Sequence, residues 1–111
     1  MKNKKILVTG SSGFIGGHVA DALEKSGFKV VLFDSISSEY KTNNQQEIIG
    51  DILNPEDVGN AIRGCHAVYH FAGQADIGIS SREPAKTILT NVIGTQNVLE
   101  AARNNNVKRI K

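Results

Sequence analysis

The stretch that decides the fold runs from Lys4 to Gly17 and reads Lys-Lys-Ile-Leu-Val-Thr-Gly-Ser-Ser-Gly-Phe-Ile-Gly-Gly. Its apolar run at 6–8 is typical of a strand buried on both faces of a parallel sheet. Gly10, Gly13 and Gly16 then recur at a spacing of three, and a helical pattern begins at once. A strand, a glycine turn and a helix N-terminus together predict an anion site. The unpaired N–H groups and the dipole of the helix favour negative charge there.

Each of the three glycines has an expected task. We expect Gly10 to allow the tight turn, Gly13 to let a diphosphate approach the backbone, and Gly16 to let the helix lie close to the strand. The pattern is not a P-loop, because no Gly-Lys-Ser or Gly-Lys-Thr follows, and two residues separate the first two glycines instead of one. A bland turn between a strand and a helix is the alternative. The flanking strand, the helix and an acid further along argue against it.

Composition sets broad limits on what the chain is. Its 111 residues suit one domain, and 40% hydrophobic with 22% charged residues predict a packed core. A net charge of +2 gives no reason to expect nucleic acid or an anionic membrane as a partner, and no apolar run approaches the ~20 residues of a membrane span. The single cysteine, Cys65, excludes an intramolecular disulfide and favours a small buried side chain over a reactive thiol. We therefore expect a cytoplasmic protein.

Strands and helices alternate along the rest of the chain. Further strands are expected at 29–34, 47–51, 66–72 and 107–110, and helices after Gly13, after Asn54 and after Glu83. The first helix is expected to have an apolar stripe of Ile15, Val19, Ala22 and Leu23, and the last helix one of Ile88, Val92, Thr95, Leu99 and Ala102. This alternation predicts an α/β fold, a Rossmann-like doubly wound parallel sheet of order 3-2-1-4-5 in a three-layer αβα arrangement. A ligand is expected over the carboxyl ends of strands one and four.

Two acids follow predicted strands at the same edge of the sheet. Asp34 stands 18 residues after Gly16, where a dinucleotide fold places a carboxylate on the adenosine ribose hydroxyls. The alternative is a strand-end acid that caps a turn. Asp51 follows the third strand, and its position fits an adenine amino group and a loop acid equally well.

Other polar and small residues leave two interpretations open. Phe71, Ala72 and Gly73 leave room for a flat ring, but they also suit simple packing of a helix on a sheet. Asn91 either faces water from the long helix or reaches into the cleft. The three histidines have no metal-ligand spacing, so no metal site is expected.

Several sequence blocks together resemble one family. They are Val8–Gly16, Asp34, Gly50-Asp51-Ile52, His70-Phe71-Ala72-Gly73-Gln74-Ala75, Asn91-Val92-Ile93-Gly94-Thr95 and Asn97–Arg103. In this order they resemble the N-terminal, NAD-binding part of the extended short-chain dehydrogenases/reductases, the NAD-dependent epimerase/dehydratase group that includes UDP-glucose 4-epimerase. The resemblance covers nearly the whole chain. It implies a nucleotide-sugar epimerase or dehydratase that works by transient hydride transfer to NAD.

The resemblance also implies a cofactor site. Its residues are Gly10, Ser12, Gly13, Phe14, Ile15, Gly16, Asp34, Asp51, Ile52, Phe71, Ala72, Gly73 and Asn91. By this likeness the backbone of 13–15 holds the diphosphate, and Asp34 takes the ribose. Asp51 and Ile52 flank adenine, 71–73 line the centre of NAD, and Asn91 supports the active site.

The chain departs from the family in one respect. The catalytic Ser or Thr and the Tyr-x-x-x-Lys pair are absent, because Tyr40 is followed four residues later by Asn44 and Tyr69 by Gly73. We therefore expect residues 1–111 to be a partial NAD(P)-binding domain without catalytic or substrate segments, and inactive alone. A nucleotide sugar would bind only in a full-length parent. The alternative is a stand-alone dinucleotide-binding or sensing module. Self-association through an uncovered fifth strand is also expected.

Overall fold

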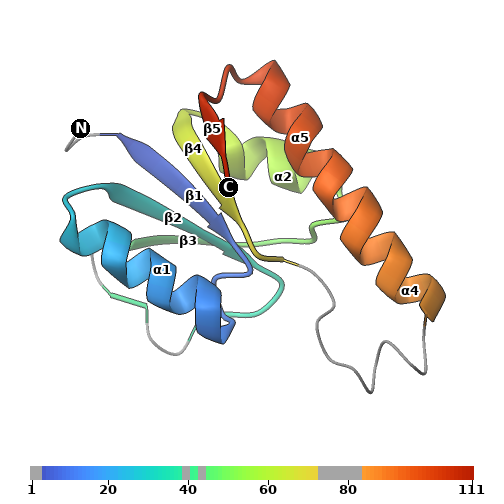
Figure 1. The fold of residues 1–111 in the computed structure, drawn as a ribbon, viewed down its shortest axis with the longest axis horizontal. Helices are drawn as coiled ribbons and strands as arrows, with labels where there is room; N and C mark the ends of the chain where they lie inside the picture. Colours follow the sequence, from blue (N-terminus) through green and yellow to red (C-terminus); the bar gives the residue numbers. More distant parts are fainter. Residues whose placement is uncertain (1–3, 39–40, 43–44, 73–83) are drawn as a thin grey trace.

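The computed structural model of the chain describes residues 4–38, 41–42, 45–72 and 84–111. Within these ranges the strands form one parallel sheet of order β3-β2-β1-β4-β5 (Figure 1). The strands are β1 (Lys5–Thr9), β2 (Lys29–Asp34), β3 (Gln45–Ile49), β4 (Cys65–His70) and β5 (Arg109–Ile110). The helices are α1 (Phe14–Lys25), α2 (Pro55–Ile62), α4 (Pro84–Ile88), the π-helical η1 (Leu89–Ile93) and α5 (Gly94–Asn104). The predicted α/β fold and strand order are confirmed.

The sheet separates two apolar cores. Side chains alternate along each strand, so Leu7 of β1 faces one side and Val8 the other. On one side, Leu7 joins Val58 of α2 and Val98 of α5, and on the other side Val8 packs with Ala20 of α1. Helices therefore cover both faces of the sheet, which gives the predicted three layers (Figure 1).

Several local signals end the elements where the sequence predicts. The side chain of Asn54 accepts hydrogen bonds from the amides of Glu56 and Asp57 at 2.9 and 3.3 Å, so α2 begins with the expected cap. After α1, Gly27 adopts a φ of +97°, which a glycine tolerates best. No helix in the described part of the chain is long and apolar enough to cross a membrane.

The predicted apolar stripe of the last helix is wrong at most of its positions. Ile88, Val92 and Leu99 are 63%, 58% and 51% exposed, whereas Ala102 is buried as predicted, together with Val98 and Ala101, which lie outside the stripe. Beyond the π-helical segment η1 the side chains are rotated, because each π turn holds more residues than an α turn, and Val98 faces the core in place of Leu99. α5 therefore meets the core mainly through Val98 and two small alanines.

The stripe of the first helix and three strand boundaries also differ from the expectation. Ile15 is 61% exposed, and Gly16 and Ala20 are buried in its place, because α1 approaches the sheet closely through small residues. β3 covers 45–49 instead of 47–51, β4 covers 65–70 instead of 66–72, and β5 is shortened to 109–110. Pairing with β2 recruits the polar Gln45, whose buried side chain donates to Asp21 Oδ1 at 3.2 Å.

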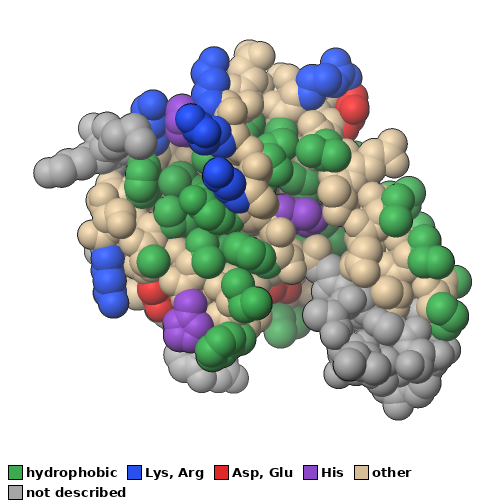
Figure 2. All heavy atoms as spheres, in the orientation of Figure 1, with side chains coloured by type: hydrophobic (Ala, Val, Ile, Leu, Met, Phe, Trp, Pro, Cys, Tyr) green, Lys and Arg blue, Asp and Glu red, His purple; other side chains and the backbone are tan. Residues whose placement is uncertain are grey.

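Self-association of the chain stays a prediction. β5 lies at one end of the sheet order, and Ile110 is 40% exposed there. Figure 2 shows hydrophobic side chains gathered on the face of the molecule that it presents. An edge strand offers unpaired backbone groups to a second chain, and a lysine there discourages pairing. Light scattering at rising concentration should show growing mass for the unmutated chain and less growth for Ile110→Lys. A monomer at high concentration would contradict this expectation.

Candidate functional site

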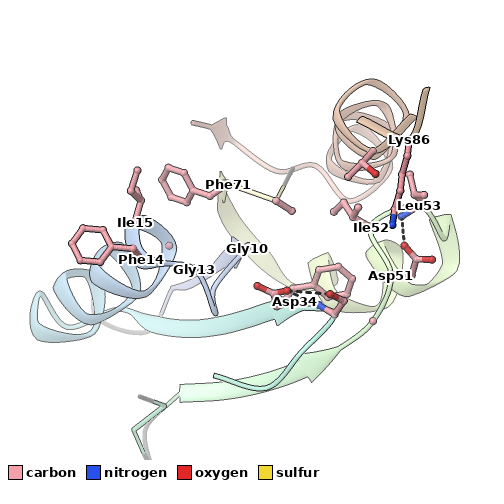
Figure 3. A pocket seen from close by; sticks show the side chains of 16 residues that line it. Gly10, Gly13, Phe14, Ile15, Asp34, Asp51, Ile52, Leu53, Phe71 and Lys86 are labelled. Carbon is pink, nitrogen blue, oxygen red and sulfur yellow. Dashed lines mark hydrogen bonds between the residues drawn. The ribbon is translucent and has the colours of Figure 1, made fainter. Parts of the chain in front are cut away.

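A cavity of about 710 Å³ opens at the carboxyl ends of the strands (Figure 3). Its walls come from the glycine turn, the end of β2, the loop after β3, the segment after β4 and the α4–η1 helix. The lining residues are Gly10, Gly13, Phe14, Ile15, Gly16, Phe33, Asp34, Ser35, Gly50, Asp51, Ile52, Leu53, Phe71, Ala72, Lys86 and Thr90. The cavity therefore lies where the strand order reverses, between β1 and β4.

The glycine turn packs too closely for side chains at two of its three glycines. Gly10 has a φ of +70°, and a Cβ on it would lie 2.7 Å from the backbone carbon of Phe71. A Cβ on Gly16 would lie 2.2 Å from the carbonyl oxygen of Gly10. The tight turn at Gly10 and the close helix at Gly16 are thus present as predicted. Gly13 differs, because a Cβ there would meet only Gly10 O, at 3.3 Å.

The N-terminus of α1 points its first turn at the cavity. Gly13 precedes the helix in an extended conformation, and no side chain caps the first turn. The N–H groups of that turn are the ones that a helix leaves without intrahelical partners. Phe14 and Ile15 are 81% and 61% exposed at the rim of the cavity (Figure 3). The arrangement suits an anion held by backbone amides.

Asp34 connects the end of β2 to the glycine turn. Its Oδ2 accepts a hydrogen bond from the Ser12 amide at 2.9 Å, and its Oδ1 accepts one from the Ser35 amide at 2.7 Å. The carboxylate thus makes the turn contact of the alternative interpretation and also lines the cavity, and its role at a ribose stays a prediction. Ser12, a predicted site residue, is not among the residues that line the cavity. Its hydroxyl donates to Ile36 O at 2.7 Å.

Three hydrogen bonds fix the loop that carries Asp51 and Ile52. The Asp51 amide donates to Asp57 Oδ2 at 3.0 Å, and Asp51 Oδ1 accepts from the Leu53 amide at 2.9 Å. Asn97 Nδ2 of α5 donates to Ile52 O, also at 2.9 Å. Asp51 therefore makes the contact of a loop acid and also lines the cavity, and its role at adenine stays a prediction.

The predicted residues after β4 divide into three groups. Phe71 and Ala72 line the cavity, and both of their amides donate to Thr9 Oγ1, at 3.0 and 3.1 Å. Gly73 lies outside the described residues. Asn91 lies in η1 and is not among the lining residues.

Reasoning from sequence motifs missed six lining residues: Phe33, Ser35, Gly50, Leu53, Lys86 and Thr90. Lys86 and Thr90 are four residues apart, which places them on one face of a helix. This spacing predicts that Lys86 and Thr90 share a helix face, but nothing in the sequence indicates that this face lines a cavity. Lys86 brings a cation to a cavity that also holds Asp34 and Asp51.

His70 makes folding stability depend on pH. Burial lowers the pKa of His70 below its ordinary value of about 6.5. The unfolded chain therefore binds a proton more readily, so the contribution of His70 is complete above pH ~6.5 and declines as the pH falls further. Urea unfolding should give a lower free energy of unfolding at pH 5.5 than at pH 7.5.

A second histidine provides the control for this prediction. The pKa of His66 is also lowered, by desolvation and by the nearby cations of Lys4, Lys108 and Arg109. His66 lies closer to solvent, so His66→Gln should remove less of the pH slope than His70→Gln. An unmutated chain with no slope between pH 7.5 and 5.5 would contradict the assignment to His70.

A family of known proteins matches almost the whole chain. The family model described as "NAD dependent epimerase/dehydratase family" matches residues 6–111. The chain belongs to this family. The match begins at Ile6 of β1 and extends to the last residue, so it includes every described residue of the cavity.

Individual members of the NAD dependent epimerase/dehydratase family are similar over most of the chain. UDP-glucose 4-epimerase from Bacillus subtilis is 37% identical over 95% of this chain and 34% of its own length. A 3-beta-hydroxysteroid dehydrogenase from Mycolicibacterium neoaurum is 31% identical over 95% of this chain and 30% of its own length. The chain thus spans about a third of the length of these relatives.

Solved structures of family members share the fold. UDP-glucose 4-epimerase from Thermotoga maritima, solved with UDP-glucose, has a TM-score of 0.89 at 37% identity, over 96% of this chain and 36% of that one. The enzyme from Thermus thermophilus, solved with NAD, has a TM-score of 0.89 at 31% identity, over 96% and 36%. These values confirm the Rossmann-like fold and the expected resemblance to UDP-glucose 4-epimerases.

Proposed function

We propose that this chain binds NAD in the 710 Å³ cavity, as the cofactor-binding part of a nucleotide-sugar epimerase or dehydratase. The observation that carries the proposal is the meeting of an uncapped helix N-terminus and the Asp34 carboxylate in one cavity. A diphosphate flanked by a ribose has the chemistry that matches these two groups. The NAD in the family description supports the choice of cofactor.

The fit of the residues supports a role for each wall of the cavity. The amides of 13–15 would hold the diphosphate, because Gly13 presents no Cβ to it. Asp34 would accept hydrogen bonds from the ribose hydroxyls, and the Asp51–Ile52 loop would lie against adenine. Phe71 and Ala72, with Gly73 beyond the described residues, would line the central part of the cofactor, and Asn91 would support the active site from η1.

NAD supplies a hydride acceptor when it is bound, and the rest of the reaction needs groups that these 111 residues do not contain. No Tyr-x-x-x-Lys occurs in them, so we propose that the chain alone binds the cofactor without turnover. A nucleotide sugar is the proposed substrate of a longer parent, supported by the UDP-glucose 4-epimerases among the relatives. A binding or sensing module without chemistry is the second candidate. The cytoplasm is the proposed location.

Titration calorimetry with NAD and the Gly13→Ala variant tests this proposal. The added methyl group would occupy the place of the diphosphate, and Gly13 has a φ of −80° that alanine adopts freely. We expect saturable binding to the unmutated chain and affinity at least about tenfold weaker in the variant.

Gly59→Ala is the matched control, because a Cβ on Gly59 meets nothing within 4 Å. It should bind NAD within about twofold of the unmutated chain, which is a difference below about 0.5 kcal/mol. Equal affinity in the unmutated chain and both variants would show that NAD does not lie against Gly13. Turnover of UDP-glucose by a repurified sample would contradict the proposed inactivity.

A further inference from the structure

His70 bridges two parts of the fold that are far apart in sequence. It is the last residue of β4, and its ring is partly buried between β1 and α5. Nδ1 lies 2.6 Å from Thr9 Oγ1, and Nε2 lies 3.1 Å from Thr95 Oγ1. The two ring nitrogens thus contact two different threonines.

The hydrogen bonds around Thr9 decide which ring nitrogen carries the proton. Thr9 Oγ1 already accepts from the amides of Phe71 and Ala72, and Thr9 is fully buried. A hydroxyl has two acceptor sites and one hydrogen, so the hydrogen is left for the contact with Nδ1. Nδ1 of His70 is therefore an acceptor, and the neutral ring carries its proton on Nε2.

The other side of the ring is consistent with this assignment. The Thr95 hydroxyl donates to the backbone carbonyl of Asn91 at 2.6 Å, so its oxygen is an acceptor for His70 Nε2–H. The Phe71 amide is shared between Thr9 O and Thr9 Oγ1, at 3.1 and 3.0 Å, and each of the other donors from Ala72 through Thr9, His70 and Thr95 to Asn91 has one acceptor. Asn91 belongs to η1, the π-helical turn, and such turns are frequent at functional sites.

We infer that His70 is a positioning residue whose ring, fixed as the Nε2–H tautomer, holds the cavity wall at 71–72 through Thr9 and the η1 segment at Asn91 through Thr95. Nδ1 acts on the cavity wall through its contact with Thr9, and Nε2 acts on η1 through its contact with Thr95. The inference rests on the proposed function in one respect, since only that function assigns 71–72 and Asn91 to the same NAD site. The geometry of the ring does not depend on it.

The first test reads the tautomer from the free chain. Imidazole ¹⁵N spectra at pH 7.5 distinguish a protonated Nδ1 from a protonated Nε2, and the His70 signals are those missing from His70→Phe. We expect the Nε2–H pattern. An Nδ1–H or a doubly protonated pattern would overturn the inference.

The second test separates the roles of the two ring nitrogens of His70 with two substitutions, His70→Asn and His70→Gln. Asparagine places its polar group near the position of Nδ1, and glutamine places one near the position of Nε2. Hydrogen exchange in His70→Asn should accelerate about five- to tenfold at Gly94, whose amide donates to Thr90 O, and stay within about twofold at Ala72. His70→Gln should show the reverse pattern.

The outcomes keep this inference apart from the proposed function. Equal acceleration at both amides in both variants would mean a merely structural histidine and would overturn the inference. Neither test uses NAD, so a chain that fails to bind NAD but shows the expected tautomer and exchange pattern refutes the proposed function alone. A chain that binds NAD but lacks the expected tautomer and exchange pattern would refute the role of His70 alone.

Discussion

Replacing Gly16 with alanine is expected to lower the free energy of unfolding by about 3 kcal/mol or more. The new Cβ would lie 2.2 Å from the carbonyl oxygen of Gly10 and 2.9 Å from its carbonyl carbon. Both atoms belong to the backbone of a turn that cannot move freely, because the Gly10 amide donates to Phe33 O at 2.9 Å. α1 must therefore shift away from β1. For a domain of this size the melting temperature should fall by more than about 10 °C.

Gly17 offers a matched control in the same helix. Its added Cβ would lie 3.5 Å from Ser11 O, which is an ordinary contact. Alanine is the better helix former, so Gly17→Ala should leave stability unchanged or raise it by up to ~1 kcal/mol. Thermal and urea unfolding of the two variants measure the difference. Similar stability for both would mean that α1 does not pack against the turn in this way.

The second large effect concerns cofactor choice. We expect NAD to bind at least about tenfold more tightly than NADP, because the 2′-phosphate of NADP would meet the Asp34 carboxylate. Two unit charges ~4 Å apart repel by about 4 kcal/mol at an effective dielectric of ~20, before screening. A third of that energy still gives a factor of about ten. Calorimetric titration with both cofactors measures the ratio.

Two substitutions isolate the charge of Asp34. Asp34→Asn removes the charge and keeps one oxygen, which can accept from the Ser12 or the Ser35 amide, so the ratio should fall to about threefold or less. Glu47→Gln is the control, because that carboxylate accepts from Ser37 and Ser38 and does not line the cavity. It should leave the ratio unchanged. Equal or tighter binding of NADP to the unmutated chain would show that Asp34 is not at the ribose.

Local patterns in the sequence predicted the part of the site that depends on neighbours along the chain. The spacing of Gly10, Gly13 and Gly16 predicted a turn whose close contacts the structure contains. The position of Asp34 at a strand end predicted its place in the cavity, because parallel strands bring their carboxyl ends to one edge.

The rest of the site depends on contacts between distant segments. The relay from Thr9 through His70 to Thr95 needs β1, β4 and α5 to be placed together, and no spacing along the chain encodes it. Lys86 of α4 lines the same cavity as the loop at 51–53, which is more than 30 residues away in the sequence. The π turn of η1 also escaped prediction, since a 3.6-residue period was assumed throughout.

The central claim is that NAD binds in the cavity formed by the glycine turn and Asp34. Amide chemical shifts of the ¹⁵N-labelled chain, followed during a titration with NAD, test it most directly. We predict saturable shifts that are largest at Gly13–Gly16, Ser35 and Ile52. Gly27 and Gln46 should stay unshifted, because they line a separate cavity of about 430 Å³ elsewhere on the chain. Shifts confined to that second cavity, or no saturable shift at all, would contradict the account.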